Sequence, residues 1–184
     1  MADSPSPLSL CAYCGSRDGA DPAYAEAAEA LGAEIAQRGW RLVYGAGDVG
    51  LMGRVARAAQ KGGAETFGVI PTHLLQREVG KRDLTSFIVT ETMHERKKVM
   101  FMNAEAVVVL PGGAGSLDEL FEVLTWRQLG LHQKPIFLLN TRGYWDKLME
   151  LVEHVIASGF AGDDIKGFLT VVDTVEELTA ALEG

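Results

Sequence analysis

At residues 111–119 the chain reads Pro-Gly-Gly-Ala-Gly-Ser-Leu-Asp-Glu, directly after the apolar run 106–110 (Ala-Val-Val-Val-Leu). This order predicts a buried parallel strand, a glycine-rich turn and the first turn of a helix. Glycine lets the backbone approach a ligand closely, and the first N–H groups of a helix carry partial positive charge and need acceptors. The stretch therefore predicts a site for a phosphate or a similar anion.

Glu119 at the same turn allows two interpretations. A carboxylate beside a bound anion costs electrostatic energy, which makes Glu119 a candidate for chemistry rather than for binding alone. However, Ser116 and Glu119 also have the Ser-x-x-Glu spacing of a capping box, in which the glutamate only starts the helix. This segment by itself leaves both interpretations open.

Short apolar strands alternate with amphipathic helical stretches along the whole chain, without an internal linker. The alternation predicts a single α/β domain over residues 1–184, a Rossmann-like doubly wound parallel sheet with helices on both faces. In the helix 115–128, Leu117, Leu120, Phe121 and Leu124 have the spacing of one buried stripe. Strands are expected at 8–13, 41–44, 66–70, 87–89, 107–110, 136–139 and 169–172, and helices at 22–37, 51–61, 93–103, 115–128, 144–156 and 175–182.

Two further glycine turns follow the first and second predicted strands, so both are expected at the carboxyl edge of the sheet, where such folds bind ligands. We interpret Gly15, Ser16, Gly45 and Gly47 as secondary phosphate or nucleotide loops. The string Gly45-x-Gly47-x-x-Gly50 also matches a dinucleotide fingerprint. It follows the second strand rather than the first, which disfavours an NAD or FAD enzyme.

The composition is that of an ordinary folded protein, with 47% hydrophobic and 23% charged residues. A net charge of −8 without a basic stripe disfavours DNA or RNA as a partner. Residues 1–7 lack the features of a secretory signal and are expected to be disordered. No apolar run reaches membrane-spanning length, so we expect a cytoplasmic protein without a membrane partner.

Cys11 and Cys14 form a Cys-x-x-Cys pair, a spacing found in redox and zinc sites. Cys11 falls inside the first predicted strand, whereas a redox pair is expected at the start of a helix. Zinc would need two further ligands, and the four histidines have no matching spacing. We therefore interpret the pair as structural.

A second cluster of chemistry-bearing residues, Met93-His94-Glu95-Arg96-Lys97-Lys98, opens the predicted helix 93–103. Basic side chains oppose the dipole at a helix N-terminus, and a nearby anionic ligand would offset that cost. This favours a function for Arg96 and Lys97. The alternative is a solvated basic helix start, and His94 is interpreted as a packing or surface residue.

Met93-His94-x-Arg96-Lys97 followed by Pro111-Gly112-Gly113-x-Gly115-Ser116-x-x-Glu119 resembles the paired signature of the Lonely Guy (LOG) family, M-H-x-R-K and P-G-G-x-G-T-x-x-E. The likeness covers nearly the whole chain, including 14–16, 44–53 and 125–135. Members are cytokinin riboside 5′-monophosphate phosphoribohydrolases, often labelled possible lysine decarboxylases. The chain departs from the family in three places: Ser116 replaces threonine, Ala46 replaces a glycine, which puts base preference in question, and Arg17 stands where serine is common.

The resemblance implies hydrolysis of the N-glycosidic bond of a purine nucleoside 5′-monophosphate, releasing adenine or an N6-modified adenine and ribose 5-phosphate. It implies Arg96 and Glu119 as catalytic residues and no metal or redox cofactor. Thr125 lies about 120° around the helix from Glu119, so both serve one site only if a second subunit contributes, as in a homodimer or larger homo-oligomer. The substrate-binding residues that the family implies are Glu78, Arg96, Lys97, Gly112, Gly113, Ala114, Gly115, Ser116, Leu117, Asp118, Glu119 and Thr125.

Three other functions are open at this point. A pyridoxal-phosphate decarboxylase needs a Schiff-base lysine in a cofactor-sized site, which a single small domain with a phosphate turn fits poorly. A non-catalytic nucleotide or cofactor carrier has no use for a carboxylate beside the phosphate. A general AMP nucleosidase fits the same residues, because none of them is assigned to the base.

Overall fold

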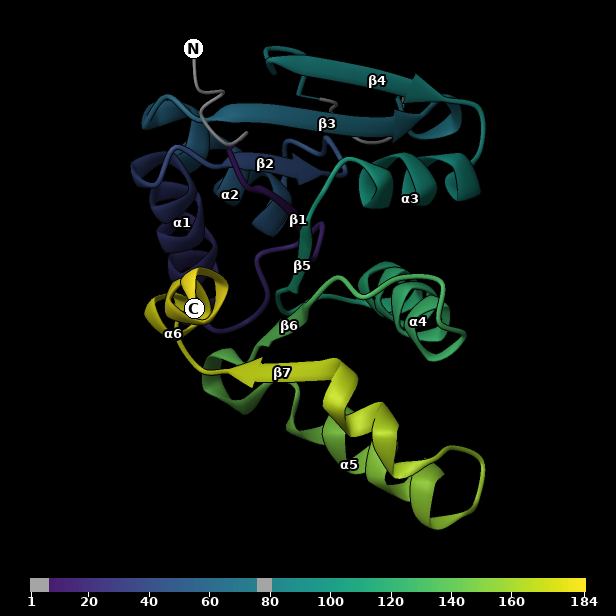
Figure 1. The fold of residues 1–184 in the computed structure, drawn as a ribbon. Helices are drawn as coiled ribbons and strands as arrows, with labels where there is room; N and C mark the ends of the chain where they lie inside the picture. Colours follow the sequence, from purple (N-terminus) through teal and green to yellow (C-terminus); the bar gives the residue numbers. More distant parts are fainter. Residues whose placement is uncertain (1–6, 76–80) are drawn as a thin grey trace, which may run out of the picture.

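A computed structural model describes residues 7–75 and 81–184 of the chain. Seven parallel strands form one sheet in the order β4-β3-β2-β1-β5-β6-β7 (Figure 1). The strands are β1 (Ser9–Tyr13), β2 (Arg41–Tyr44), β3 (Glu65–Pro71), β4 (Ser86–Thr90), β5 (Ala106–Val109), β6 (Ile136–Leu139) and β7 (Leu169–Val172). The helices are α1 (Pro22–Gln37), α2 (Gly50–Lys61), α3 (Met93–Met102), α4 (Ala114–Gln128), α5 (Asp146–Ala157) and α6 (Val175–Glu183), with short 3₁₀ turns η1 (Thr72–Leu74), η2 (Thr141–Gly143) and η3 (Asp163–Phe168).

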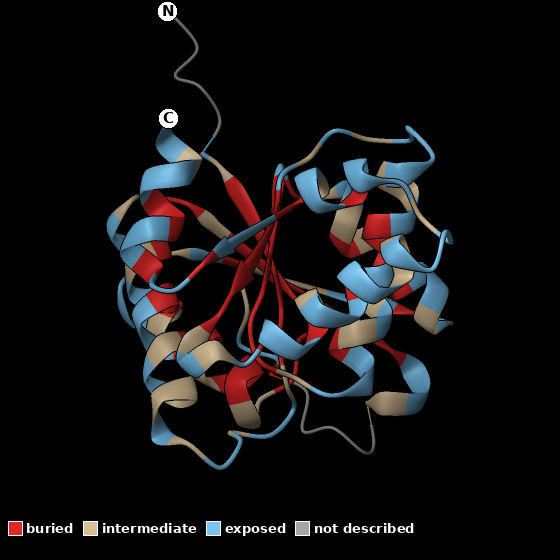
Figure 2. Cartoon of the chain, turned by 90° about the horizontal axis from the view of Figure 1, so that it is seen from below, coloured by how far each residue is buried: buried red, intermediate tan, exposed pale blue. Residues whose placement is uncertain are grey.

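Helices cover both faces of the sheet, which confirms the predicted doubly wound fold. Side chains alternate along each strand, so Leu10 and Ala12 of β1 join the core under α1, α2 and α6. Cys11 and Tyr13 point the other way, into the core under α3, α4 and α5. Figure 2 shows the buried strands lying between two layers of helices whose outer faces are exposed.

The predicted buried stripe of α4 is partly wrong. Leu120 and Leu124 are buried as expected, but Val123 completes the stripe, Leu117 is half-buried and Phe121 is 40% exposed. The helix is therefore rotated toward Val123 relative to the expected orientation. Because apolar residues occupy more than one face of α4, spacing alone did not identify the buried one, and the exposed Phe121 has to be explained by something outside this packing.

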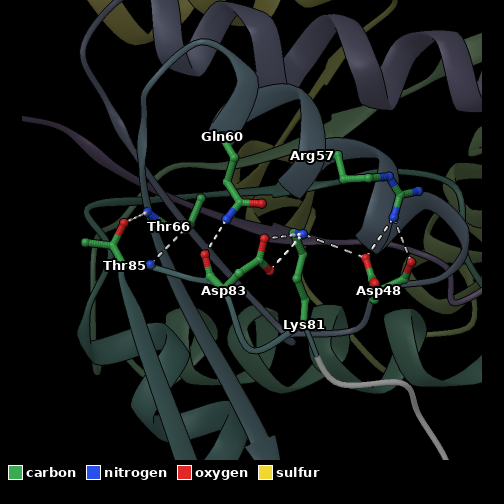
Figure 3. A network of polar contacts seen from close by, with 7 residues as sticks. All are labelled: Asp48, Arg57, Gln60, Thr66, Lys81, Asp83 and Thr85. Atoms are coloured by element: carbon green, nitrogen blue, oxygen red, sulfur yellow. Dashed lines mark hydrogen bonds and ion pairs between the residues drawn. The ribbon is translucent and has the colours of Figure 1, made fainter.

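The connection from β3 to the parallel edge strand β4 contains, among its described residues, only the short turn η1. Its return segment is tied to the turn after β2. The Lys81 N–H donates to the Ala46 carbonyl at 2.9 Å, and Lys81 Nζ pairs with Asp83 Oδ1 at 2.9 Å. Thr66 and Thr85 exchange reciprocal backbone-to-hydroxyl bonds of 3.1 and 3.2 Å. Figure 3 shows the network, which comprises Asp48, Arg57, Gln60, Thr66, Lys81, Asp83 and Thr85.

Gly32→Ala tests the close approach of α1 to α2. A Cβ at Gly32 would stand 2.3 Å from the Val55 carbonyl oxygen, so the two helices would have to separate. We expect the free energy of unfolding to fall by about 1–3 kcal/mol, although alanine is the better helix former. Gly167→Ala, where a Cβ meets no atom within 4 Å, is the control and should change stability by less than about 0.5 kcal/mol. Equal urea midpoints for both variants would contradict the packing described.

Candidate active site

A cleft lies at the carboxyl ends of β1, β2 and β5. The chain winds outward from β1 to β4 and returns to the other side of β1 with β5, so the helices that follow β1 and β5 lie on opposite faces of the sheet. Parallel sheets bind ligands at such a topological switch point. The cleft has a volume of about 230 Å³. The described residues that line it are Ala12, Cys14, Gly15, Ser16, Gly45, Met52, Leu74, Met93, Arg96, Gly113, Ala114, Gly115, Ser116 and Glu119.

The N-terminus of α4 contributes backbone N–H groups to the cleft. Gly113 is the N-cap residue, no side chain caps the helix, and the Leu117 N–H makes a bond back to the Gly113 carbonyl at 3.1 Å. Gly113 and Gly115 border open space, since no atom lies within 4 Å of a Cβ built on either. Ser116 is buried against Gly112, where a Cβ would stand 2.0 Å from Ser116 Oγ. The turn is thus shaped for close backbone contact with an anion.

The capping-box interpretation of Ser116 and Glu119 does not hold. Because α4 begins at Ala114 with Gly113 as its cap, Ser116 is the third helical residue and Glu119 the sixth. Their spacing therefore cannot close a capping box around the helix start. A real capping box forms on α3, where Thr92 Oγ1 accepts from the Glu95 N–H at 3.2 Å and Glu95 Oε2 accepts from the Thr92 N–H at 3.1 Å. Glu119 lines the cleft instead.

Arg96 is buried beside the cleft and held by the ends of β2 and β3. Its Nε donates to the Val69 carbonyl at 3.0 Å, its Nη2 donates to the Gly45 carbonyl at 2.6 Å, and its Nη1 lies 3.9 Å from Met93 Sδ. Gly45 has to be glycine, because a Cβ there would stand 2.0 Å from Nη2. All three partners are neutral, so the guanidinium brings its positive charge to the cleft wall.

The charges of Glu119 and Arg96 both affect the pKa of Cys14, which lines the cleft. Burial raises the pKa of the Cys14 thiol well above its ordinary value, Glu119 raises it further, and Arg96 acts in the opposite direction. Burial and the Glu119 charge also raise the pKa of the Cys11 thiol. Cys14, Arg96 and Glu119 all line the same cleft. Both thiols stay protonated and unreactive, in agreement with a structural Cys-x-x-Cys pair.

Lys97, which the sequence favoured as a ligand contact, is not among the described residues that line the cleft. Its side chain is 5% exposed, and its Nζ pairs with Asp118 Oδ2 at 3.0 Å and Glu122 Oε2 at 2.9 Å. These ion pairs join α3 to α4. The next position after Arg96 is rotated by about 100°, which explains why the two side chains diverge. Asp118 and Leu117 likewise lie outside the cleft, with Leu117 packed against the core.

The other predicted site residues divide between the cleft and its surroundings. Gly15, Ser16 and Gly45 line the cleft, whereas Gly47 borders it indirectly, because a Cβ there would stand 2.8 Å from Met52 Cε. Glu78 lies outside the described residues. Thr125 is exposed on a different face of α4 from Glu119, in a shallow surface hollow lined by Asp118, Phe121, Glu122, Thr125 and Trp126.

Ala46 packs away from the cleft. It is fully buried in the left-handed region at φ 58°, and a Cβ on Gly68 would stand 2.8 Å from its methyl group. The methyl group thus fills space between the β2 turn and β3. A direct contact of Ala46 with a ligand base is not expected from this position.

Met52, Leu74 and Met93 form an apolar wall of the cleft that was not predicted from the sequence. Met52 lies in the first turn of α2, Leu74 in η1, and Met93 opens α3. A signal for Met52 existed in the string 44–53 that carries the family likeness. Leu74 had none, because it lies in a long connection without periodicity.

Fold and cleft together define a Rossmann-type α/β protein with a glycine-rich turn and a helix N-terminus at its switch point. The chain belongs to the LOG family, whose model, described as "Possible lysine decarboxylase", matches residues 52–182. It is 42% identical over 174 residues to the Oryza sativa cytokinin riboside 5′-monophosphate phosphoribohydrolase LOG, covering 95% of this chain and 72% of that protein. It is 41% identical to the Arabidopsis thaliana enzyme LOG7, covering 95% and 80%.

Solved structures of lower identity share the fold. The molybdenum cofactor binding protein from Rippkaea orientalis has a TM-score of 0.73 at 22% identity, with 98% of each chain covered. The Chlamydomonas Moco carrier protein has a TM-score of 0.72 at 21% identity, with 96% of each chain covered.

Among the helices of residues 7–75 and 81–184, none has the length and apolar character that a membrane-spanning helix requires.

Lys97→Met tests the α3–α4 ion pairs. Asp118 and Glu122 would lose their shared cation, and we expect the free energy of unfolding to fall by about 2 kcal/mol at pH 7. Burial by itself lowers the pKa of Lys97, but Glu122 and Asp118 outweigh it and the net pKa is raised. The ion pairs of Lys97 therefore stabilise the fold fully below the pKa of an unfolded-state lysine, about 10.4. This stabilisation is lost as the pH rises through the raised pKa of Lys97 in the folded state.

Urea unfolding between pH 7 and pH 11 should show the difference between wild type and Lys97→Met shrinking at the alkaline end. Lys147→Met is the control, since Lys147 pairs with Glu150 on the exposed surface of α5 and its loss should leave the midpoint unchanged. A pH-independent difference for Lys97→Met would show that lost packing, not charge, explains its effect.

Proposed function

We propose that this protein is a phosphoribohydrolase that cleaves the N-glycosidic bond of a purine nucleoside 5′-monophosphate, giving the free base and ribose 5-phosphate. The observation that carries the proposal is that Arg96, Glu119 and the N-terminus of α4 line one cleft. The names of the relatives at about 40% identity point to the same reaction. A cytoplasmic location stays a prediction from the sequence.

The 5′-phosphate would bind at the N-terminus of α4. The N–H groups of 113–116 supply donors and the partial positive charge of the helix, and open space beside Gly113 and Gly115 admits a ligand. Ser116 Oγ would add a hydrogen bond to the phosphate. A nucleoside without the phosphate loses these contacts, so the proposed enzyme discriminates against it.

Hydrolysis needs stabilisation of positive charge on the ribose as the base departs, as in glycoside hydrolysis. The Glu119 carboxylate near C1′ would stabilise this charge and accept a proton from the attacking water. The water oxygen bonds to C1′, the bond from C1′ to the base nitrogen breaks, and its electron pair leaves with the base, which takes up a proton. Arg96 would orient the nucleotide and support the departing base.

The apolar wall of Met52, Leu74 and Met93 is the proposed contact surface for the base. Thioether and aliphatic side chains suit the flat face of a purine, and methionine adapts its shape to different substituents. The wall therefore accommodates adenine and N6-modified adenines alike. The relative rates of hydrolysis of AMP and of an N6-modified AMP distinguish general AMP cleavage from cytokinin activation.

The two other functions suit this cleft less well. None of the described residues that line it is a lysine, as a pyridoxal-phosphate Schiff base requires, and Lys81 and Lys97 are engaged in ion pairs with Asp83 and Asp118. Cofactor carriers share the fold at 21–22% identity. A carrier has no need for Glu119 in the cleft beside an anion-binding turn.

We also propose a homodimer built on the exposed face of α4. Phe121 is exposed there, Thr125 lies in the same surface hollow, and Met102 and Leu129 are exposed at the ends of α3 and α4. Exposed apolar side chains gathered on one face mark interaction surfaces. Such an interface would bring Thr125 toward a site on a second copy, as the family resemblance implies.

Glu119→Gln should lower kcat by about 10²- to 10⁴-fold, because the amide keeps the shape but neither carries the charge nor accepts the proton. Free base and ribose 5-phosphate released from AMP and from isopentenyladenosine monophosphate are followed by chromatography, with the matching nucleosides as unreactive controls. Glu153→Gln, on the exposed surface of α5, should retain full activity. An active Glu119→Gln variant would remove Glu119 from the mechanism, and an inactive wild type would refute the proposed reaction.

Phe121→Asp should convert the dimer to a monomer, because it places a charge in the centre of the proposed apolar interface. Light scattering after size-exclusion chromatography measures the mass directly. Phe160→Asp replaces an exposed phenylalanine that follows α5 and should leave the dimer intact. A monomeric wild type, or a Phe121→Asp variant that stays dimeric, would contradict this assignment.

A further inference from the structure

Tyr144 lies directly behind the phosphate turn and is bonded to it. It follows η2, after β6, and its hydroxyl donates to the Gly112 carbonyl at 2.5 Å. Its ring makes edge contacts with Tyr24 of α1, at 5.6 Å between ring centroids, and with Trp145, at 4.8 Å. These contacts hold the ring in place, so the hydroxyl reaches one defined atom of the turn.

The hydrogen bond from Tyr144 to the Gly112 carbonyl also determines where the N–H of Gly113 points. A trans peptide unit is planar, and its C=O and N–H point to opposite sides. Since the Gly112 carbonyl points toward Tyr144, the N–H of Gly113 in the same peptide unit points away from it. Gly112, Gly113 and Tyr144 line a second cleft beside the proposed active-site cleft. Gly113 is also among the described residues that line the proposed active-site cleft, whereas Gly112 is not. The Gly113 N–H is therefore aimed to the cleft side.

A peptide between two glycines needs such a restraint. Glycine reaches both signs of φ at little energy, so the unit joining Gly112 and Gly113 can rotate and turn its carbonyl toward the cleft. A carbonyl oxygen there would repel a phosphate. In the described structure, the Tyr144 hydroxyl opposes that rotation, because it bonds the carbonyl on the far side.

We propose that Tyr144 is a positioning residue for phosphate binding, which holds the Gly112–Gly113 peptide with its N–H toward the 5′-phosphate. The proposal rests on the proposed function for its substrate, but its physical content is the affinity of the turn for phosphate. Tyr144 is 38% exposed, so loss of its hydroxyl leaves the Gly112 carbonyl accessible to water and has little effect on folding.

Tyr144→Phe is the test, because it removes the hydroxyl and keeps the ring. Tyr24→Phe is the matched control, because the Tyr24 ring contacts Tyr144 but Tyr24 is not among the described residues that line the cleft. Binding of inorganic phosphate is measured by ³¹P NMR line broadening, and KM and kcat are measured with AMP. We expect the phosphate Kd and the KM for AMP to rise together, about three- to tenfold, in Tyr144→Phe, with kcat within about twofold of wild type.

The two measurements separate this proposal from the proposed function. If the wild type binds phosphate but does not hydrolyse AMP, the proposed hydrolase function fails, while the phosphate Kd of Tyr144→Phe still decides the role of Tyr144. Unchanged phosphate affinity in Tyr144→Phe, an equal loss in Tyr24→Phe, or no phosphate binding by the wild type would each overturn the proposal. A lower unfolding midpoint without a change in phosphate Kd would show that Tyr144 only packs.

Discussion

The close backbone contact between the turns after β1 and β5 is the constraint on which the cleft depends. The Gly15 N–H donates to the Pro111 carbonyl at 3.0 Å, and a Cβ on Gly15 would stand 3.3 Å from the Cα of Gly112. Side chains at these positions would push the two turns apart. Because the turns touch, the N-terminus of α4 lies directly beside the first strand, and the first N–H groups of the helix face residues from both halves of the sheet.

Charge in the cleft follows from where the neighbouring strands end. Arg96 comes from α3, but its guanidinium is held by the carbonyls of Val69 and Gly45, at the ends of β3 and β2. Glu119 comes from the second turn of α4, past the donors at the helix start. A positive group on α3, and a negative group and a helix N-terminus on α4, are thus held at separate points of the cleft. We infer that this separation allows one nucleotide to meet a phosphate site and a catalytic carboxylate together.

Much of this arrangement was predictable from the sequence, since strand and helix patterns have different periods and the glycine turns mark the strand ends. The strands at 41–44, 136–139 and 169–172 and the helix 22–37 have the predicted bounds. Side-chain directions were harder to predict. Lys97 follows Arg96 directly yet pairs with α4, and Phe121 fits a buried spacing yet is exposed. Both outcomes depend on how α3 and α4 rotate against the sheet, which local sequence does not determine.

A crystal structure of the Glu119→Gln variant soaked with AMP would show whether this cleft holds a nucleotide as proposed. We expect the 5′-phosphate on the N–H groups of 113–116 and the ribose C1′ between the side chains at 96 and 119, with the base against Met52 and Met93. A phosphate bound at the Gly45 turn instead, or a ribose placed away from position 119, would show that this cleft is not the site of N-glycosidic hydrolysis as proposed.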